Sequence, residues 1–198
     1  MARARRTLVC VLAVAVLVLA LAACGGGGDD EGDIADVIQT SLKSTDPANC
    51  TKLATQQFVN QTDFSTGEQA IKECQDAAAD TSDNPDSVEV TQIEVDGDNA
   101  AANVSFTGGS FGGSTLAVAL VKDGEGWKLD KITDIVKLDV ATFKQAFADR
   151  VAASGDASAQ VKACITQAIQ GASADQIKQA LLGGTEQDLI TLFSQCIP

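Results

Sequence analysis

The sequence predicts an α+β protein in which three helices precede a four-stranded antiparallel sheet and a small all-helical module follows it. Two changes of hydrophobic period carry this prediction. Apolar residues recur at helical spacing before position 80 and again after position 139, whereas between positions 87 and 132 they alternate as in strands. Turn-rich segments separate the alternating runs, so consecutive strands are expected to pair as a meander.

The helical start contains three predicted helices. The first covers Ile34–Leu42, with Asp33 as its N-cap, and the second covers Ala48–Phe58. The third covers Gly67–Ala79, with Thr66 as a possible cap. Apolar positions repeat along one face of each segment, so we expect Cys50 of the second helix and Cys74 of the third to point inward from neighbouring helices.

Four strands are predicted next. Ser87–Val95 is rich in β-branched residues, and the DGDN turn at 96–99 is a strong hairpin signal before the returning strand at 102–106. Thr115–Val121 alternates with leucine and valine on one face, and the KDGEG turn leads into the last strand, Trp127–Ile132. Trp127 is expected in the core.

Helical periodicity returns at Asp139. Phe143 and Phe147 belong to a stripe that is expected to pack the C-terminal module onto the sheet domain. A second helix is expected over Ala157–Gln170, and Ser173 with Gln176 predicts a capping box that opens the next helix. A last helix is expected to carry Cys196 near the end of the chain.

Helices followed by an antiparallel sheet resemble the nuclear transport factor 2-like fold, as found in small bacterial lipoprotein domains of unknown function. The resemblance rests on the helical start with Cys50 and Cys74, on VEVTQIEVDGDNAAANVSF, and on LVKDGEGWKLDKI. It covers Asp33 to about Leu138 and implies that the sheet is curved into a cone-shaped roll with a conical cavity. Such rolls host enzymes as well as binding proteins, so the fold alone leaves the activity open.

The N-terminus has the pattern of an export signal. MARARR carries three arginines, and an uncharged apolar run extends from Leu8 to Ala23. LAAC at 21–24 resembles the lipobox of bacterial lipoproteins, which implies cleavage before Cys24 and transfer of a diacylglycerol, with fatty chains such as palmitate, to its thiol. The expected organisation is a signal peptide (1–23), a lipidated cysteine with a flexible Gly/Asp-rich tether (24–32), the α+β domain (33–138) and a disulfide-closed helical module (139–198).

Four cysteines remain after the signal and the lipidated residue. An even number in an exported protein predicts disulfides, and four cysteines allow three pairings. We expect Cys50 to pair with Cys74 and Cys164 with Cys196, because each bridge then lies within one module. Zinc is not expected, since the chain has no closely spaced CxxC pair.

Charge and composition exclude several functions. Three of the 14 basic residues precede Cys24 and all 27 acidic residues follow it, so the chain from Cys24 onward carries a net charge of −16. Such a surface repels nucleic acid. The chain has no histidine and no tyrosine, which removes the commonest general base and the commonest transition-metal ligand.

Few side chains are candidates for a site. Asp46 and Asp63 are possible cavity acids, although turn and cap roles are the simpler expectation. Asp96, Asp98 and Asn99 lack the twelve-residue calcium pattern and are explained by the hairpin. Phe111, between glycine pairs, is a possible ligand-contacting residue at a cavity rim, or alternatively folds onto the sheet.

The expected function is that of a lipoprotein anchored by its lipid to the extracytoplasmic face of the cell membrane. It is expected to bind a small molecule or peptide without catalysis, either in the cone or in a groove of the C-terminal module. An envelope scaffold that contacts another protein and has no ligand cavity is the alternative. An enzyme that uses a carboxylate in the cone cavity is the third hypothesis. No cofactor, metal site or catalytic residue is expected.

Overall fold

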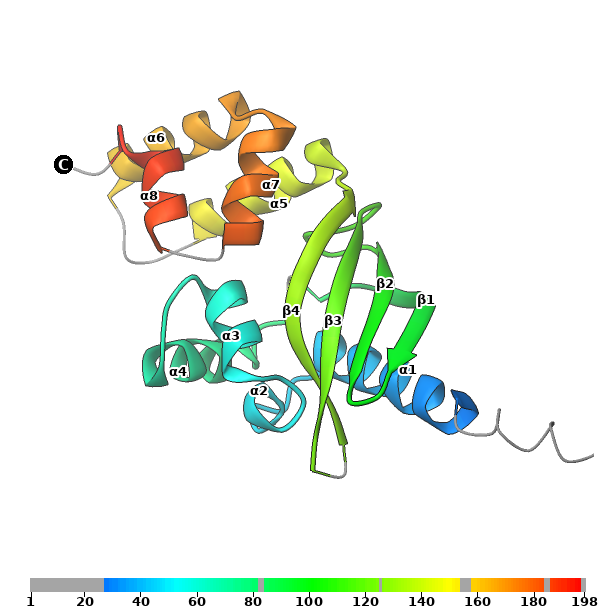
Figure 1. The fold of residues 1–198 in the computed structure, drawn as a ribbon. Coiled ribbons are helices and arrows are strands. Elements are labelled where there is room, and N and C mark those ends of the chain that lie inside the picture. Colours follow the sequence, from blue (N-terminus) through cyan, green and yellow to red (C-terminus); the bar gives the residue numbers. More distant parts are fainter. Residues whose placement is uncertain (1–26, 82–83, 125, 154–157, 184–185, 197–198) are drawn as a thin grey trace, which may run out of the picture.

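The computed structural model describes residues 27–81, 84–124, 126–153, 158–183 and 186–196, and its fold is α+β (Figure 1). The described residues form four strands and eight helices. In chain order these are α1 (Gly27–Lys43), α2 (Asn49–Lys52), α3 (Gln56–Asp63), α4 (Glu68–Ala77), β1 (Ser87–Asp96), β2 (Asn99–Thr107), β3 (Thr115–Asp123), β4 (Gly126–Lys137), α5 (Val140–Ala153), α6 (Ala159–Gly171), α7 (Ala174–Gly183) and α8 (Glu186–Phe193).

The sheet confirms the predicted antiparallel meander, with strand order β1-β2-β3-β4. Along β2 and β3 every second side chain is buried, as alternation requires of a sheet with one covered face. The register shifts between Thr91 and Glu94 of β1 and at three points between β3 and β4. Such irregularities bend strands, and β4 curves strongly in Figure 1.

The main core fills the covered face of the sheet. α1 packs against β1 and β4, and α3 packs against β4. Ile34 and Ile38 of α1 are fully buried, as are Leu120 of β3 and Leu129 of β4. Trp127 is 3 % exposed, so its predicted place in the core is confirmed. The apolar stripes of the helices and the alternating face of the sheet therefore bury each other.

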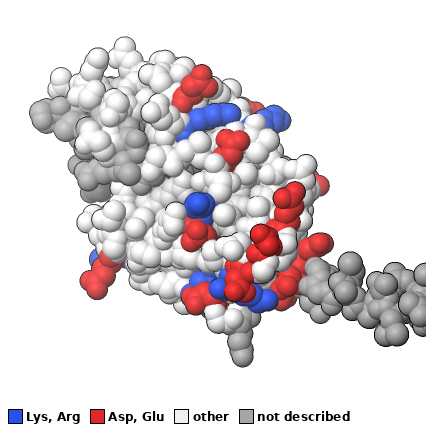
Figure 2. Space-filling view, in the orientation of Figure 1, with Lys and Arg blue, Asp and Glu red and all other residues white. Residues whose placement is uncertain are grey.

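The first helix begins earlier than the sequence predicts. α1 starts at Gly27, so the prediction of a flexible tether over 24–32 is wrong for residues 27–32. Asp30 accounts for part of this extension, because its Oδ1 accepts hydrogen bonds from Lys122 Nζ (2.9 Å) and Trp127 Nε1 (3.1 Å). The bond from Lys122 lowers the pKa of the Asp30 carboxyl. Figure 2 shows acidic side chains gathered near the start of α1, with a few basic ones among them.

The second predicted helix is divided in two. Ala48–Phe58 contains α2 and the start of α3, which are separated by Leu53–Thr55. Backbone bonds to Leu129 of β4 interrupt the helix here: Leu129 N donates to Leu53 O (2.9 Å) and Thr55 N donates to Leu129 O (2.8 Å). Thr55 then caps α3 by accepting from Phe58 N. The predicted Thr66 cap is also wrong, since Gly67 occupies the N-cap position of α4.

The C-terminal helices follow their sequence signals closely. The predicted capping box is confirmed, because Gln176 N donates to Ser173 Oγ (3.2 Å) and Ser173 N donates to Gln176 Oε1 (2.9 Å). Ser158 caps α6 in a similar way through Val161 N. In Figure 1 α5–α8 group beyond one end of the sheet, above α3, and α7 contacts both β4 and α3.

Both predicted disulfides are confirmed. Cys50 pairs with Cys74, which joins α2 to α4, and Cys164 pairs with Cys196, which joins α6 to the end of the chain. Each bridge closes a loop inside one of the two predicted modules, with sequence separations of 24 and 32 residues.

Gln61 joins three parts of the fold through its side-chain amide. Its Nε2 donates to Ile132 O (3.0 Å) and Leu182 O (3.2 Å), and its Oε1 accepts from Ile132 N (2.8 Å). We expect Gln61→Ala to lower the free energy of unfolding by about 2 kcal/mol, because it leaves partly buried backbone groups unpaired. Urea unfolding measures this loss. Gln57→Ala, at an exposed position of the same helix, is the control and should change stability by less than about 0.5 kcal/mol.

Candidate ligand-binding site

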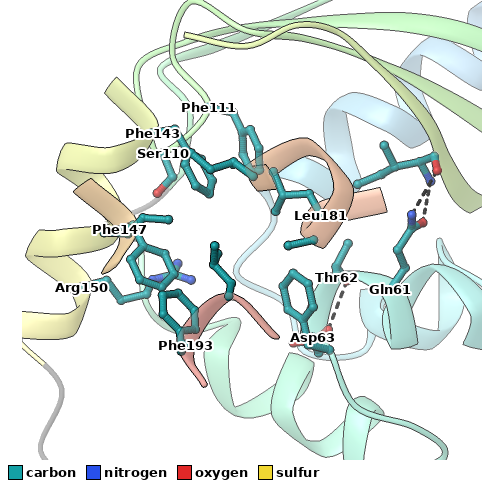
Figure 3. A pocket seen from close by; sticks show the side chains of 16 residues that line it. Gln61, Thr62, Asp63, Ser110, Phe111, Phe143, Phe147, Arg150, Leu181 and Phe193 are labelled. Carbon is teal, nitrogen blue, oxygen red and sulfur yellow. Dashed lines mark hydrogen bonds between the residues drawn. The ribbon is translucent and has the colours of Figure 1, made fainter. Parts of the chain in front are cut away.

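A cavity of about 440 Å³ lies between α3 and the C-terminal helices, beside the loop that joins β2 to β3. Every helix from α5 to α8 contributes to its wall, and β4 contributes one residue (Figure 3). The lining residues are Gln61, Thr62, Asp63, Phe64, Ser110, Phe111, Ile132, Phe143, Phe147, Arg150, Ile169, Ile177, Ala180, Leu181, Leu192 and Phe193.

Aromatic rings dominate this wall. Five of the seven phenylalanines in the chain line the cavity. Four of them follow one another at ring-centroid distances of 5.6 Å (Phe111 to Phe143), 6.2 Å (Phe143 to Phe147) and 5.6 Å (Phe147 to Phe193). These separations are typical of favourable aromatic pairs. The wall is therefore a set of connected ring faces and edges.

Phe111 reaches the cavity from a glycine-rich loop. Gly113, with a φ of +76°, allows the loop to fold back so that Gly113 N donates to Phe106 O (2.9 Å). Phe111 is then held between Phe106 of the sheet (5.8 Å) and Phe143 of α5. The structure thus places the predicted rim residue in the cavity wall, where it also packs on the sheet domain.

Asp63 supplies a carboxylate to this apolar wall. It is the last residue of α3, and its Oδ2 accepts a hydrogen bond of 3.2 Å from the Thr62 hydroxyl. Burial raises the pKa of the Asp63 carboxyl from 3.8 to about 6, while the Thr62 bond opposes the rise, Glu73 adds to it and Arg150 reduces it. The sequence predicts a turn or cap role for Asp63, and the structure adds a place in the cavity wall.

Arg150 is the other charged residue of the lining. It belongs to α5 and is exposed, so it stands at the mouth of the cavity. In Figure 3 Arg150 lies beside Phe147 and Phe193, whereas Asp63 lies on the α3 side. The two charges therefore sit on different walls with apolar side chains between them.

The remaining sequence candidates lie away from the cavity. Asp46 has the expected turn role, since its Oδ1 accepts from Ala48 N (3.0 Å). Asp96 and Asn99 face each other across the β1–β2 hairpin and are exposed. Within the described ranges, no three His, Cys, Asp or Glu side chains come close enough together to hold a metal ion. Cys24, the predicted lipidation site, lies outside the described residues.

The sequence did not single out Gln61, Phe64, Arg150 or Phe193 as site residues. The sequence left two places open for a ligand, the cone or a groove of the C-terminal module. The covered face of the sheet is filled by core side chains such as Val104, Val118 and Leu120, which are at most 3 % exposed. The cavity lies instead where the sheet domain meets the C-terminal helices, at a kind of boundary where ligand sites are common.

Asp63 is expected to make stability depend on pH. Its folded-state pKa of about 6 exceeds the unfolded value near 3.9, so the stability it contributes is complete below about pH 4 and is lost as pH rises through about 6. Asp63→Asn should therefore match the wild-type protein near pH 4 and exceed its free energy of unfolding by about 1 kcal/mol near pH 7.5, after allowance for solvent screening.

Urea unfolding of both proteins across this pH range measures the difference. Asp36→Asn removes the same charge from an exposed position of α1 and should show no such divergence. A constant difference between Asp63→Asn and wild type at all pH values would contradict the assignment of a buried carboxyl.

Comparisons with known proteins place the chain in no family. No family model, no curated protein and no solved structure matches it. Among the described helices, none combines the length and the apolar character needed to cross a membrane.

Proposed function

We propose that this protein is a lipid-anchored extracytoplasmic binding protein that holds a small molecule or peptide with an apolar part and performs no chemistry on it. Cys24 of the LAAC motif is the proposed lipid attachment site, and the outer face of the cell membrane is the proposed location. The cavity between α3 and α5–α8 is the proposed binding site.

The observation that carries this proposal is the cavity itself. Its volume of about 440 Å³ falls in the range of small-molecule sites, about 300–1,000 Å³. Apolar side chains form most of its wall, and two charged groups (Asp63 and Arg150) belong to it, which is the usual composition of a ligand site. A packed helical interface without a ligand would be expected to close such a space.

Two features support the proposed location. Disulfides form and persist in oxidising compartments outside the cytoplasm, and this chain has two. The helical body begins at Gly27, only three positions after Cys24, so a lipid on that thiol would hold the start of α1 close to the membrane surface. Two or more acyl chains are needed for durable attachment, and the lipobox resemblance implies them.

A nuclear transport factor 2-like roll is the proposed fold of the α+β domain. Helices that precede a four-stranded meander, and bulges that bend β3 against β4, support it. In this proposal core side chains fill the covered face of the sheet, and the ligand binds in the cavity beside the C-terminal helices.

An envelope scaffold remains the alternative. Val136 (52 % exposed) and Val95 (37 % exposed) are large apolar residues on the surface, but they lie on β4 and β1, the opposite edges of the sheet. A docking face normally gathers several such residues in one patch. The cavity therefore favours ligand binding over the scaffold.

A carboxylate-based enzyme is the other alternative, and Asp63 is the observation that favours it. A carboxyl with a pKa of about 6 is suited to proton transfer near neutral pH. Acid–base catalysis usually pairs such a group with a second titratable group, and among the described lining residues the only other charged one is an arginine. Binding without chemistry is thus the simpler use of this wall.

The proposal is tested by filling the cavity. Ala180 is 6 % exposed and lines the site, so Ala180→Leu should reduce the available volume. The neutral fluorophore N-phenyl-1-naphthylamine should bind the wild-type protein and bind this variant at least about tenfold more weakly. Gln179→Leu, at the preceding exposed position of α7, is the matched control and should bind normally.

Native mass spectrometry of the protein from its own membrane adds a second readout. Retained small molecules that disappear in Ala180→Leu support the proposal. Recovery of the unliganded protein from every preparation, together with equal fluorophore binding by both variants, would overturn it in favour of the scaffold.

A further inference from the structure

We infer that the cavity selects organic cations, namely ammonium groups that carry apolar substituents. This inference rests on the proposed binding function and narrows its ligand class. It follows from four observations on the cavity wall: the aromatic faces, the carboxylate of Asp63, the helix ends around it, and the backbone conformation of Phe64.

The aromatic faces are the first observation. Phe64, Phe111, Phe143, Phe147 and Phe193 surround one small volume. The face of a phenyl ring carries partial negative charge, so a cation within about 6 Å of the ring centroid is attracted to it. Several such faces around one space form the kind of aromatic cage that recognises quaternary ammonium groups. A neutral apolar ligand would gain only the burial of its surface.

The second observation is the carboxylate at the edge of this cage. Among the described residues, Asp63 has one hydrogen-bond partner, the Thr62 hydroxyl, which donates to Oδ2. Asp63 is half-buried, and partial burial of a carboxylate is costly unless a positive charge or further donors compensate it. A cationic ligand supplies that charge without leaving a polar group of its own unpaired. An anionic ligand would instead add repulsion.

The third observation concerns the helix ends on the same wall. α3 ends at Asp63, and Leu182 in the last turn of α7 approaches the same helix through its bond to Gln61. The C-terminal end of a helix carries partial negative charge from its unpaired carbonyl groups. The end of α3 therefore adds to the negative potential that Asp63 creates on this side of the cavity, whereas the Leu182 carbonyl near the end of α7 is occupied by its bond from Gln61.

The fourth observation is the backbone of Phe64. It follows Asp63 with a φ of +53°, the left-handed conformation that usually falls to glycine at the end of a helix. A bulky residue is rarely found there because the conformation is strained. The protein thus retains an aromatic ring at the position next to the carboxylate where glycine is the favoured residue.

Arg150 fixes the orientation of the ligand. It is exposed at the mouth and lies on the α5 side of the cavity. Its positive charge disfavours a cation at the mouth and favours one near Asp63. The apolar substituents of the ligand are therefore expected to point toward Phe147 and Phe193, with the ammonium group on the α3 side.

Three probes of nearly equal shape separate the possible ligand classes. Benzyltrimethylammonium is the cation, neopentylbenzene is its neutral isostere, and phenylmethanesulfonate is an anion of similar size. Titration followed by NMR should show that the cation binds about tenfold or more tightly than the neutral isostere, and that the anion binds most weakly. The wild-type protein with its disulfides intact is used throughout.

Variants test the assigned residues. Asp63→Asn keeps the shape of the side chain and should weaken cation binding at least about tenfold more than it changes binding of the neutral probe. Asp36→Asn removes an equal charge from exposed α1 and should have little effect. Arg150→Gln should strengthen cation binding by up to about threefold.

Protonation offers a further check. Asp63 faces Thr62 of its own helix, Glu73 of α4 and Arg150 of α5. Cation affinity should fall as pH drops through about 6 in the wild-type protein and should stay flat over this range in Asp63→Asn.

The outcomes separate this inference from the proposed function. Equal binding of the cation and the neutral isostere, with no effect of Asp63→Asn, would overturn the cation preference while leaving a binding function in place. Tightest binding of the sulfonate, abolished by Arg150→Gln, would overturn it in favour of an anion site. If none of the three probes binds, the inference is wrong, and the fluorophore test with Ala180→Leu decides the proposed function separately.

Discussion

Replacing Cys164 and Cys196 together by serine is expected to lower the free energy of unfolding by about 3–4 kcal/mol and to release α8 from the protein. The bridge closes a loop with a sequence separation of 32 residues, and in the chain-entropy model its loss restores that much freedom to the unfolded state. α8 is only eight residues long, too short to persist as an isolated helix in water.

The position of the bridge makes this effect local as well as global. Cys196 lies three residues after Phe193, and Phe193 stacks on Phe147 at 5.6 Å. Once the end of the chain is free, Phe193 and Leu192 no longer have a fixed place in the cavity wall. The variant should therefore lose binding of an apolar probe under conditions where the sheet domain is still folded.

Hydrogen exchange measured by mass spectrometry checks this prediction. Amides of α8 should exchange much faster in the double variant, while those of β2 and β3 keep their protection. The matched control is Cys50→Ser with Cys74→Ser, which removes a bridge of similar loop length from α2 and α4. There the faster exchange should appear in α2–α4, with α8 unchanged. Unaltered protection of α8 in the first variant would contradict the role given to its bridge.

Local signals in the sequence predicted much of the fold correctly. The four-strand meander and the Ser173–Gln176 capping box depend on residues that are close in sequence or repeat with a clear period. Such features are encoded by a few neighbouring side chains, so no knowledge of distant contacts was required. Both disulfides join cysteines of the same predicted module, with separations of 24 and 32 residues.

The errors came from contacts between distant parts of the chain. The division between α2 and α3 results from backbone bonds to Leu129, far along the sequence. The early start of α1 involves Asp30 and its bond to Trp127, a separation of 97 residues. The Gly/Asp-rich composition of 24–32 predicts flexibility in isolation, whereas residues 27–32 are helical and Asp30 has partners on β3 and β4.

The shape of the cavity depends on distant contacts in the same way. The sequence indicates Asp63 as a possible cavity acid, but its partial burial depends on packing among elements that are distant in sequence. Phe111 was singled out because glycines flank it, and that local signal identified one of the five rings. The spacing of Phe143 and Phe147 predicts a packing stripe. This prediction covers the contact between the two rings but not the cavity beside them.

Phe143→Ala is expected to lower the free energy of unfolding by about 3–5 kcal/mol, the usual loss when a buried phenylalanine is truncated. Phe143 is 8 % exposed and is the central ring of the aromatic series, with Phe111 at 5.6 Å on one side and Phe147 at 6.2 Å on the other. It also belongs to the smaller core that α5–α8 form and touches the loop residue that joins this core to the sheet.

The same substitution should enlarge the cavity, because the removed ring is part of its wall. Phe58→Ala distinguishes a change in binding that results from lost stability from one that results from a larger cavity. Phe58 is also 8 % exposed but belongs to the main core and does not line the cavity. Both variants should unfold at lower urea concentration, whereas only Phe143→Ala should change which apolar probes bind.

The affinity of a bulkier neutral fluorophore, divided by that of N-phenyl-1-naphthylamine, should therefore rise in Phe143→Ala. In Phe58→Ala this ratio of affinities should stay at its wild-type value. The measurement requires conditions in which both variants remain folded by circular dichroism. An unfolding free energy within about 1 kcal/mol of wild type for Phe143→Ala would show that this ring is not packed as described. In that case the aromatic wall could not have the fixed geometry on which selection of a cation depends.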